Sequence, residues 1–120
     1  MTSKSRVEHY RRLNGKYLRE ADQLLEKTDY PQASEKFWGA AAEIIKSVAA
    51  KRGATLGTHR TLAEYVESLH RERPELDLVR GFDAAEGLHI NFYEDHLPEV
   101  TVRRRGEAVR EFVKKMEQLL

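Results

Sequence analysis

The stretch that decides the fold is residues 30–50, YPQASEKFWGAAAEIIKSVAA. Its apolar side chains recur at intervals of three and four residues, which is the spacing of one face of an α-helix. They are Tyr30, Ala33, Phe37, Ala40, Ala41, Ile44, Ile45, Val48 and Ala49. This face is wide, and Gly39 with the three alanines after it makes the helix surface thin, so a neighbouring helix can approach closely. We therefore predict that this stretch forms the central helix of the fold.

Both ends of the central helix carry residues that helix ends favour. Asp29 and Gln32 have the spacing of an N-terminal capping pair, and Pro31 is tolerated in a first turn. Gly53 is a favourable residue just past a helix C-terminus. The predicted helix therefore runs from a turn at Asp29 to about Arg52.

Helical spacing extends outward from this stretch in both directions. Apolar residues again recur at three- and four-residue steps, which predicts four more helices. These helices are expected at about residues 5–27, 60–71, 74–92 and from 98 onward.

Prolines and glycines further define where the predicted helices begin and where they cross. We expect Pro74 to open the fourth helix and Pro98 the fifth, and we expect backbones to cross at Gly81 and Gly87. The one β-branched cluster, residues 100–102, is too short to make a sheet. The sequence thus predicts an all-α fold, an up-and-down antiparallel bundle of four to five helices that forms one domain over residues 1–120.

Charge is high in amount but balanced in sign, with 21 Lys and Arg against 20 Asp and Glu. Such a balance argues against binding of nucleic acid by bulk charge, and leaves only local basic patches to do so. Two basic patches stand out. Each either binds nucleic acid or is simply a solvent-exposed helix face or end. They are Arg103–Arg105 and the group Lys51, Arg52, His59 and Arg60.

Cysteine and membrane signals are both missing from the sequence. The chain has no cysteine, which excludes disulfides and thiolate metal sites. No apolar run approaches the roughly 20 residues needed to span a bilayer, and residues 1–12 do not have the character of a signal peptide. We expect a cytoplasmic protein that does not contact a membrane.

Three stretches together resemble a known family. The first runs from KYLREA at residues 16–21 through YPQASEKFWGAAA at residues 30–42. The second is THRTL at residues 58–62, and the third is LHINFYE at residues 88–94. This combination resembles the archaeal PaREP family of the HEPN superfamily, small helical domains often paired with nucleotidyltransferases.

The resemblance implies a helical bundle that commonly dimerises and associates with RNA or nucleotides. Many HEPN proteins are metal-independent ribonucleases or toxin-like partners, and the resemblance implies no cofactor. Their signature is an arginine, four to six residues, then a histidine near the end of the fourth helix. Here the positions that precede His96 at that spacing hold His89, Ile90 and Asn91. A literal match, Arg52 to His59, spans the loop between the second and third helices instead.

Two histidines are the candidate catalytic residues if the protein is an enzyme. His89 or His96 would act as the base on a ribose 2′-hydroxyl, and Arg80 or Arg103 would supply positive charge at the phosphate. No metal site is expected, because His89, Glu94 and His96 lack the spacing of zinc ligands.

Further polar residues are candidates for substrate binding. Asn91, Tyr93 and Glu94 lie in the distinctive string with His89, where they line a cleft or else cap the helix end. His59 and Arg60 follow a possible N-cap and can hold a phosphate at a helix N-terminus, or else serve as loop residues.

Two other side chains of the central helix have a function in one interpretation and a structural role in another. Trp38, beside Phe37, can stack a base, but such a residue in a central helix is expected in the core or a dimer interface. Lys46 is expected to extend from the apolar helix toward solvent.

Two hypotheses from different classes remain open. The first is a HEPN-type homodimer that binds RNA or a nucleotide, acting as a toxin-like component or beside a nucleotidyltransferase-type partner. The alternative is a non-catalytic module for dimerisation or protein interaction with no nucleic-acid activity. The polar string at residues 88–94 favours the first, and the missing arginine favours the second.

Overall fold

Five α-helices and one short 3-10 helix make up the computed structural model, which describes residues 2–120. No strand occurs within this range. The predicted all-α bundle is thereby confirmed. The elements are α1 (Ser3–Glu26), α2 (Tyr30–Lys51), α3 (His59–Glu72), η1 (Pro74–Leu76), α4 (Leu78–Glu94) and α5 (Glu99–Glu117).

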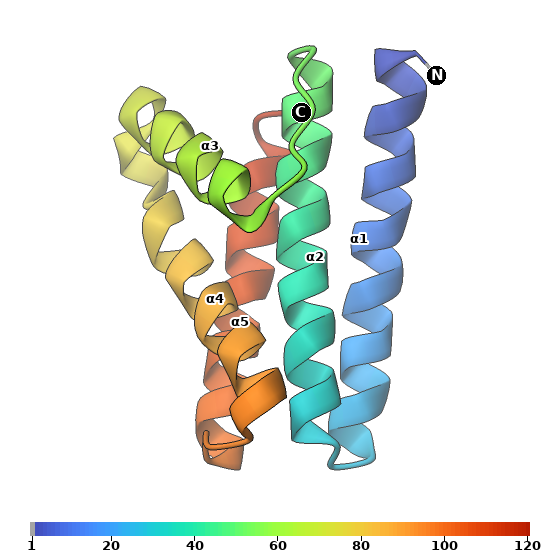
Figure 1. The fold of residues 1–120 in the computed structure, drawn as a ribbon, viewed down its shortest axis with the longest axis vertical. Coiled ribbons are helices and arrows are strands. Elements are labelled where there is room, and N and C mark those ends of the chain that lie inside the picture. The colour runs from blue at the N-terminus through green and yellow to red at the C-terminus, as the bar shows by residue number, and fades with distance from the viewer. Residues whose placement is uncertain (1) are drawn as a thin grey trace.

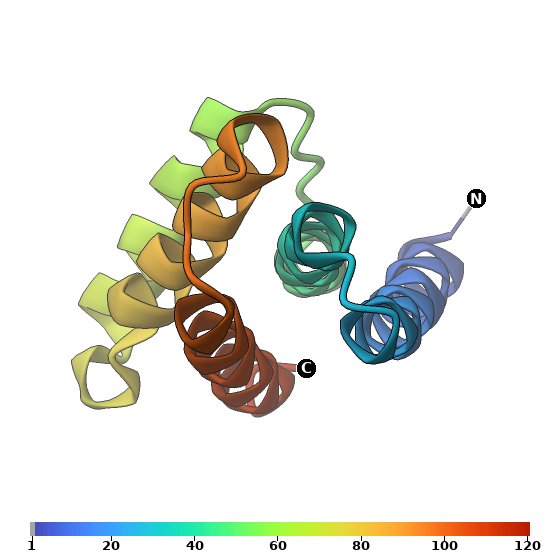
Figure 2. The same cartoon turned by 90° about the horizontal axis from the view of Figure 1, so that it is seen from below.

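Helix α2 is the centre of the fold, as predicted. It lies between α1 on one side and α4 and α5 on the other, which the end-on view makes plain (Figures 1 and 2). Its side chains are buried on more than one face, because helices cover it from two directions. The largest that are fully buried are Phe37, Ile44, Ile45 and Val48.

Side-chain caps define where the helices begin. The Asp29 carboxylate accepts a hydrogen bond from the Gln32 amide at 3.2 Å and so starts α2 as predicted. At the start of α3, Thr58 and Thr61 each accept a hydrogen bond from the backbone amide of the other, at 3.1 and 3.0 Å. This capping box fixes His59 as the first residue of α3.

Helix α3 departs from the up-and-down arrangement of the other helices. It begins beside α2 and runs obliquely away from it to the start of α4 (Figure 1). The loop before it begins at Gly53, whose φ of +78° ends α2 in the manner predicted. Because this loop runs back along α2, the first residue of α3 lies over the middle of the bundle rather than at one end (Figure 1).

The prediction that Pro74 opens the fourth helix is wrong. Residues Pro74–Leu76 form a separate 3-10 turn, and Asp77 adopts the left-handed conformation, with φ at 51°, before α4 begins at Leu78. Leu76 and Leu78 are both buried, so the left-handed residue lets the chain change direction while both leucines stay in the core.

Close approach of α4 and α5 depends on Gly81, as predicted. A Cβ atom at this position would lie 2.5 Å from the Cβ of Phe112, which real structures do not tolerate. Gly106 of α5 likewise lies against the ring of Phe37 in α2. The three helices therefore pack at short distance around two phenylalanines.

Across residues 2–120, no helix combines the length and the apolar character that a membrane crossing requires.

Candidate functional site

Three aromatic rings from three helices meet on the surface of the bundle, and we call Trp38, His59 and His89 the ring cluster. The His89 ring stacks on Trp38, with centroids 4.8 Å apart and planes 23° apart. His59 lies 4.7 Å from Trp38 and 5.6 Å from His89. Residues far apart in the sequence, on α2, α3 and α4, thus form one compact group.

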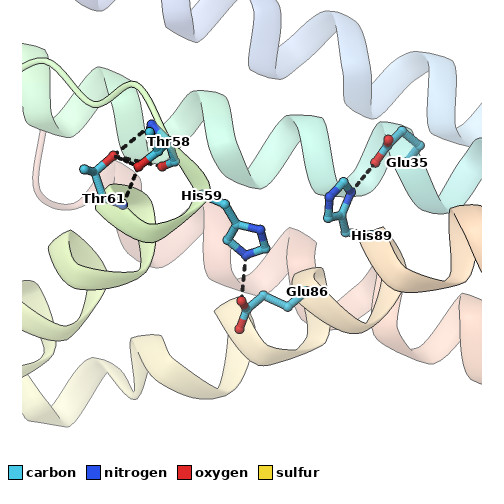
Figure 3. A network of polar contacts seen from close by, with 6 residues as sticks. All are labelled: Glu35, Thr58, His59, Thr61, Glu86 and His89. Atoms are coloured by element: carbon cyan, nitrogen blue, oxygen red, sulfur yellow. Dashed lines mark hydrogen bonds and ion pairs between the residues drawn. The ribbon is translucent and has the colours of Figure 1, made fainter.

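Each histidine of the ring cluster is held by a carboxylate (Figure 3). His59 Nε2 lies 2.7 Å from Glu86 Oε2, and His89 Nδ1 lies 2.8 Å from Glu35 Oε1. A carboxylate only accepts hydrogen bonds, so the ring nitrogen that faces it carries the hydrogen. This leaves His59 Nδ1 and His89 Nε2, the opposite nitrogens of the two rings, to exchange a proton or meet a ligand.

Helical spacing places the carboxylates beside the rings. Glu35 and Trp38 are three residues apart on α2, and Glu86 and His89 are three residues apart on α4, so each pair shares a helix face. Phe82, one turn before Glu86, is buried with its ring centroid 5.8 Å from Trp38. Phe82 therefore closes the ring cluster on the side that faces the core.

A groove of about 320 Å³ adjoins the ring cluster, and we call it the α2 groove. Glu35 and Trp38 line it and also belong to the site described above. Tyr17 of α1 forms part of its wall, because Gly39 has no side chain to push that ring away. A Cβ atom on Gly39 would lie 3.0 Å from the Tyr17 ring.

Two lysines and two carboxylates, Glu35 and the buried Glu43, supply the charge of the α2 groove. Lys36 Nζ lies 3.1 Å from Glu20 and 5.1 Å from the centre of the Tyr17 ring. Lys46 Nζ lies 3.4 Å from Glu43 Oε1, and its side chain reaches solvent as predicted. Glu43 itself is only 9% exposed, and its Oε2 atom has no hydrogen-bond partner within residues 2–120.

The chemistry available in the α2 groove follows from these groups. The lysines can contact phosphate oxygens, and the free Glu43 oxygen can accept a hydrogen bond from an amino group of a ligand. The Tyr17 and Trp38 rings can pack against a flat apolar ligand.

Some residues singled out by the sequence come together at this site. His59 and His89 are both in the ring cluster, and Tyr93 approaches the edge of His89 with ring centroids 5.6 Å apart. The side chain of Tyr93 is 72% exposed, so it extends the aromatic surface into solvent.

Asn91 lies elsewhere, in the interior. Its Nδ2 donates a hydrogen bond to Ser34 Oγ at 3.1 Å, and its Oδ1 accepts from the amides of His96 and Leu97, each at 2.9 Å. The residue is completely buried. Asn91 thus ties the turn between α4 and α5 to α2.

His96 and Glu94 form a pair of their own beyond the end of α4. His96 Nδ1 lies 3.5 Å from Glu94 Oε2, and both side chains are more than half exposed. Neither residue is part of the ring cluster.

The candidate arginines are engaged in other ion pairs on exposed surfaces. Arg60 pairs with Glu64 of its own helix. Arg80 Nε lies 2.9 Å from Asp77, just before α4. The arginine of the literal Arg–His match, Arg52, pairs with Glu72 at 2.7 Å.

Arg103 occupies a further surface pair on α5. Its Nε donates to Glu99 at 3.1 Å, and its guanidinium lies 5.8 Å from the centre of the Tyr30 ring. Hydrogen bonding to Tyr30, and then to Glu99, raises the pKa of Arg103. The arginines singled out by the sequence therefore lie in ion pairs of their own, and the cations that line the α2 groove are lysines.

Sequence reasoning missed most partners of the two histidines. Trp38 was expected either to stack a base or to lie in the core or a dimer interface, and it is a half-buried member of the ring cluster that also packs against the core. Glu35, Glu86 and Lys36 were not singled out at all. The signal present in the sequence was a glutamate three residues before Trp38 and another three residues before His89.

Histidine and carboxylate side chains are also the types of residue that ligate metal ions. Within residues 2–120, no three side chains of His, Asp or Glu are arranged to hold a metal ion. The groups of the ring cluster are instead paired one to one, each histidine with its own glutamate.

Fold and site together define a small helical bundle that carries a cluster of paired histidines and carboxylates where α3 and α4 meet its central helix. The sequence model of the archaeal PaREP1/PaREP8 family matches residues 9–113. The chain belongs to this family, which confirms the PaREP part of the resemblance.

A solved structure shares this fold. A protein from Sulfolobus solfataricus, known from a crystal structure, aligns with a TM-score of 0.77 and 26% sequence identity. The alignment covers 89% of this chain and 95% of the Sulfolobus chain. Among curated proteins, none matches the sequence.

Proposed function

We propose that the protein is a HEPN-type bundle that binds single-stranded RNA or nucleotides across the ring cluster and the α2 groove. The observation that carries this proposal is the continuity of the two features. Trp38 and Glu35 belong to both, so stacking rings, two histidines, two lysines and the glutamates that pair with them form one surface. Single-stranded nucleic acids bind to surfaces that combine aromatic rings, on which bases stack, with cations that contact the phosphates.

The properties of single-stranded RNA fit this surface better than those of a duplex. Unpaired bases stack on aromatic side chains and present their edges to hydrogen-bonding groups. Tyr93 beside His89 and Tyr17 in the groove wall provide further ring surface, and Glu43 Oε2 can accept from a base amino group. Net charge is only +1, so the phosphate contacts in this proposal come from the local lysines and not from bulk charge.

Charge reversal in the α2 groove tests the proposal. In a Lys46→Glu variant we expect the affinity for a fluorescently labelled single-stranded RNA to fall about tenfold or more, because a phosphate contact becomes a repulsion. Fluorescence anisotropy at fixed salt measures the change. Lys114→Glu is the matched control, since Lys114 also pairs with a glutamate three residues earlier but lies on α5. Equal affinity in the two variants would contradict the assignment of RNA to this groove.

A second candidate is the non-catalytic interaction module, and one observation favours it. Ile90 and Tyr93 on α4 are 51% and 72% exposed, and their spacing puts them on one helix face. Such a face suits a homodimer contact, as the HEPN resemblance implies, or a nucleotidyltransferase-type partner. A toxin-like role is part of the first candidate function, RNA binding, and not of the interaction module.

Oligomeric state tests the role of this face. We expect the wild-type chain to be a dimer by light scattering and the Ile90→Asp variant to be a monomer, because a charge there would lose its water on association. Val100→Asp is the control, since Val100 is a similarly exposed apolar residue on α5. A monomeric wild type at all concentrations would remove the homodimer from the proposal.

A further inference from the structure

We propose that the outer face of α1 binds the phosphate backbone of a base-paired RNA segment. We call this surface the α1 basic face and define it by Arg11, Arg12, Lys16 and Arg19, which line one open hollow of about 540 Å³. The inference extends the proposed function, because it adds a double-stranded part to an RNA whose single-stranded part binds at the ring cluster and the α2 groove. The α1 basic face shares no residue with those two features.

Positive charge is concentrated near the start of the chain. Residues 4–19 hold six lysines and arginines against one glutamate, Glu8. The whole chain holds 21 lysines and arginines against 20 acidic residues, so the rest of the chain is acidic on balance. The small net charge is therefore the sum of a basic segment and an acidic remainder, and the field of the basic segment attracts a polyanion to α1.

The cations of the α1 basic face lack the partners that other surface cations have. Arg12, Lys16 and Arg19 are exposed and form no ion pair within residues 2–120, and no aspartate or glutamate of this range lines their hollow. Arg11 has a partner, Glu117 of α5, at 3.7 Å. By contrast, exposed ion pairs on α3 and α5 place a glutamate four residues from an arginine. The charges of the α1 basic face are thus available to a ligand.

Helix α1 carries these like charges at spacings that bring them together. Arg12 and Lys16 are four residues apart and Lys16 and Arg19 are three apart, so they share one face and repel each other. Arg19 reaches back along the helix, since a Cβ atom on Gly15 would lie 3.3 Å from its Nη1 atom. Gly15 thus leaves room for the Arg19 guanidinium in the hollow that Arg11 also lines. Phosphate oxygens would offset the repulsion, and guanidinium groups bind them in bidentate fashion.

A second hollow continues the basic surface toward the start of α1. It has a volume of about 380 Å³ and is lined by Lys4, Lys51 and Arg11, of which Arg11 also lines the first hollow. Its one acidic side chain within residues 2–120 is Glu8. Positions 4 to 19 extend over roughly 22 Å of helix, which is long enough to contact several phosphates of one strand.

The residue types on this surface favour a duplex over other ligands. Within residues 2–120, no Trp, Tyr or Phe lines either hollow, so unpaired bases would find no ring to stack on. A duplex keeps its bases stacked on one another and presents its phosphates. The exposed large apolar side chains of the same range are Ile90, Tyr93 and Val100, on α4 and α5. A protein partner or a membrane would bury such side chains, and α1 does not offer them.

The α1 basic face and the α2 groove lie on adjoining sides of one helix. Helix α1 stands at the edge of the bundle with α2 beside it, and no helix of residues 2–120 covers its outer side (Figures 1 and 2). Lys16 lines the hollow of the α1 basic face, and the next residue, Tyr17, lines the α2 groove. An RNA with its stem on α1 can therefore place a single-stranded extension in the α2 groove.

The test is the binding of a fluorescently labelled, blunt-ended RNA duplex, which offers no unpaired base to the ring cluster. We expect the Arg12→Gln/Lys16→Gln double variant to bind the duplex about tenfold more weakly or worse. The slope of log affinity against log salt concentration should become shallower by about 2, since two phosphate contacts are lost. Glutamine keeps the helix propensity of the replaced residues, and thermal unfolding followed by circular dichroism establishes that the variant is folded.

Arg71→Gln/Arg73→Gln is the matched control. It removes the same charge at the C-terminal end of α3, on the side of the bundle away from α1 (Figures 1 and 2). We expect this variant to bind the duplex with an affinity and a salt dependence close to those of the wild type. An equal loss in the two double variants would assign duplex binding to net charge and would overturn the inference.

A duplex with a single-stranded tail tests the path from α1 to the α2 groove. It should bind more tightly than the blunt duplex or the free tail, because the second contact forms within one complex. Trp38→Ala should remove this gain and leave the affinity for the blunt duplex unchanged. A tail that adds no affinity would contradict the connection between the two surfaces.

Separate ligands distinguish this inference from the proposed function. Binding of single strands without duplexes would overturn the α1 basic face and leave the α2 groove in place. Duplex binding through Arg12 and Lys16 without binding of single strands would support the inference and remove the proposed function. Poly-glutamate, or vesicles of phosphatidylcholine and phosphatidylserine, are the competing ligands. If either binds more tightly than the duplex and is equally sensitive to Arg12→Gln/Lys16→Gln, RNA is not the occupant of this face.

Discussion

Substitution of Asn91 by alanine is expected to lower the free energy of unfolding by about 2–4 kcal/mol. Asn91 is completely buried and makes three hydrogen bonds, to Ser34 and to the amides of His96 and Leu97. Alanine would leave these partly buried amides without their acceptor and would release the turn between α4 and α5. Urea denaturation followed by circular dichroism measures the change.

Asn14 provides a matched control for this substitution. It is also a buried asparagine in a helix, but its side chain makes one hydrogen bond, from Nδ2 to the carbonyl of Ala40 at 2.7 Å. That carbonyl also lies within the hydrogen-bonded interior of α2. Asn14→Ala should therefore cost about 1 kcal/mol. If the two variants are equally stable, Asn91 does not have the role in the α4–α5 turn that its contacts indicate.

Removal of the Trp38 ring should have the largest effect on RNA binding. Stacking of a base on an aromatic side chain contributes about 1–3 kcal/mol, so Trp38→Ala should weaken binding by roughly 5- to 150-fold. Trp38 also supports both histidines through ring contacts at 4.7 and 4.8 Å. Isothermal titration calorimetry with a short single-stranded RNA measures the loss.

Trp38→Phe is the informative comparison. Phenylalanine keeps a flat ring at the position, so it should retain a good part of the affinity that alanine loses. Thermal unfolding of both variants establishes that they are folded at the temperature of the titration. Full affinity in a folded Trp38→Ala variant would exclude Trp38 from the RNA-binding surface.

Much of the fold followed from the sequence because helix signals are local. The apolar face of residues 30–50 identified α2 as the central helix, and the residues at its two ends gave its limits. The start of α4 was misplaced because Pro74 is equally suited to open an α-helix or a 3-10 turn. Only the packing of Leu76 and Leu78 into the same core decides between them.

The site was predictable only in part, because it depends on which helix faces meet. His59 and His89 were both singled out, but nothing local indicates that α3 begins beside α2 and so brings the two rings together at Trp38. Asn91 lies in the same distinctive string as His89 and yet turns inward, two residues further along α4. One string of sequence therefore serves both the site and the bundle interior.

The central claim, that RNA binds at the ring cluster and the α2 groove, is tested most directly by the fluorescence of Trp38. Trp38 is the one tryptophan of the chain, and it lines both features, so its emission reports on this site alone. We predict that titration of the wild-type protein with short single-stranded RNA changes Trp38 emission in a saturable way, and that added salt weakens the effect. Binding detected by anisotropy with no change in Trp38 emission would place the RNA elsewhere, and no binding at all would contradict the account.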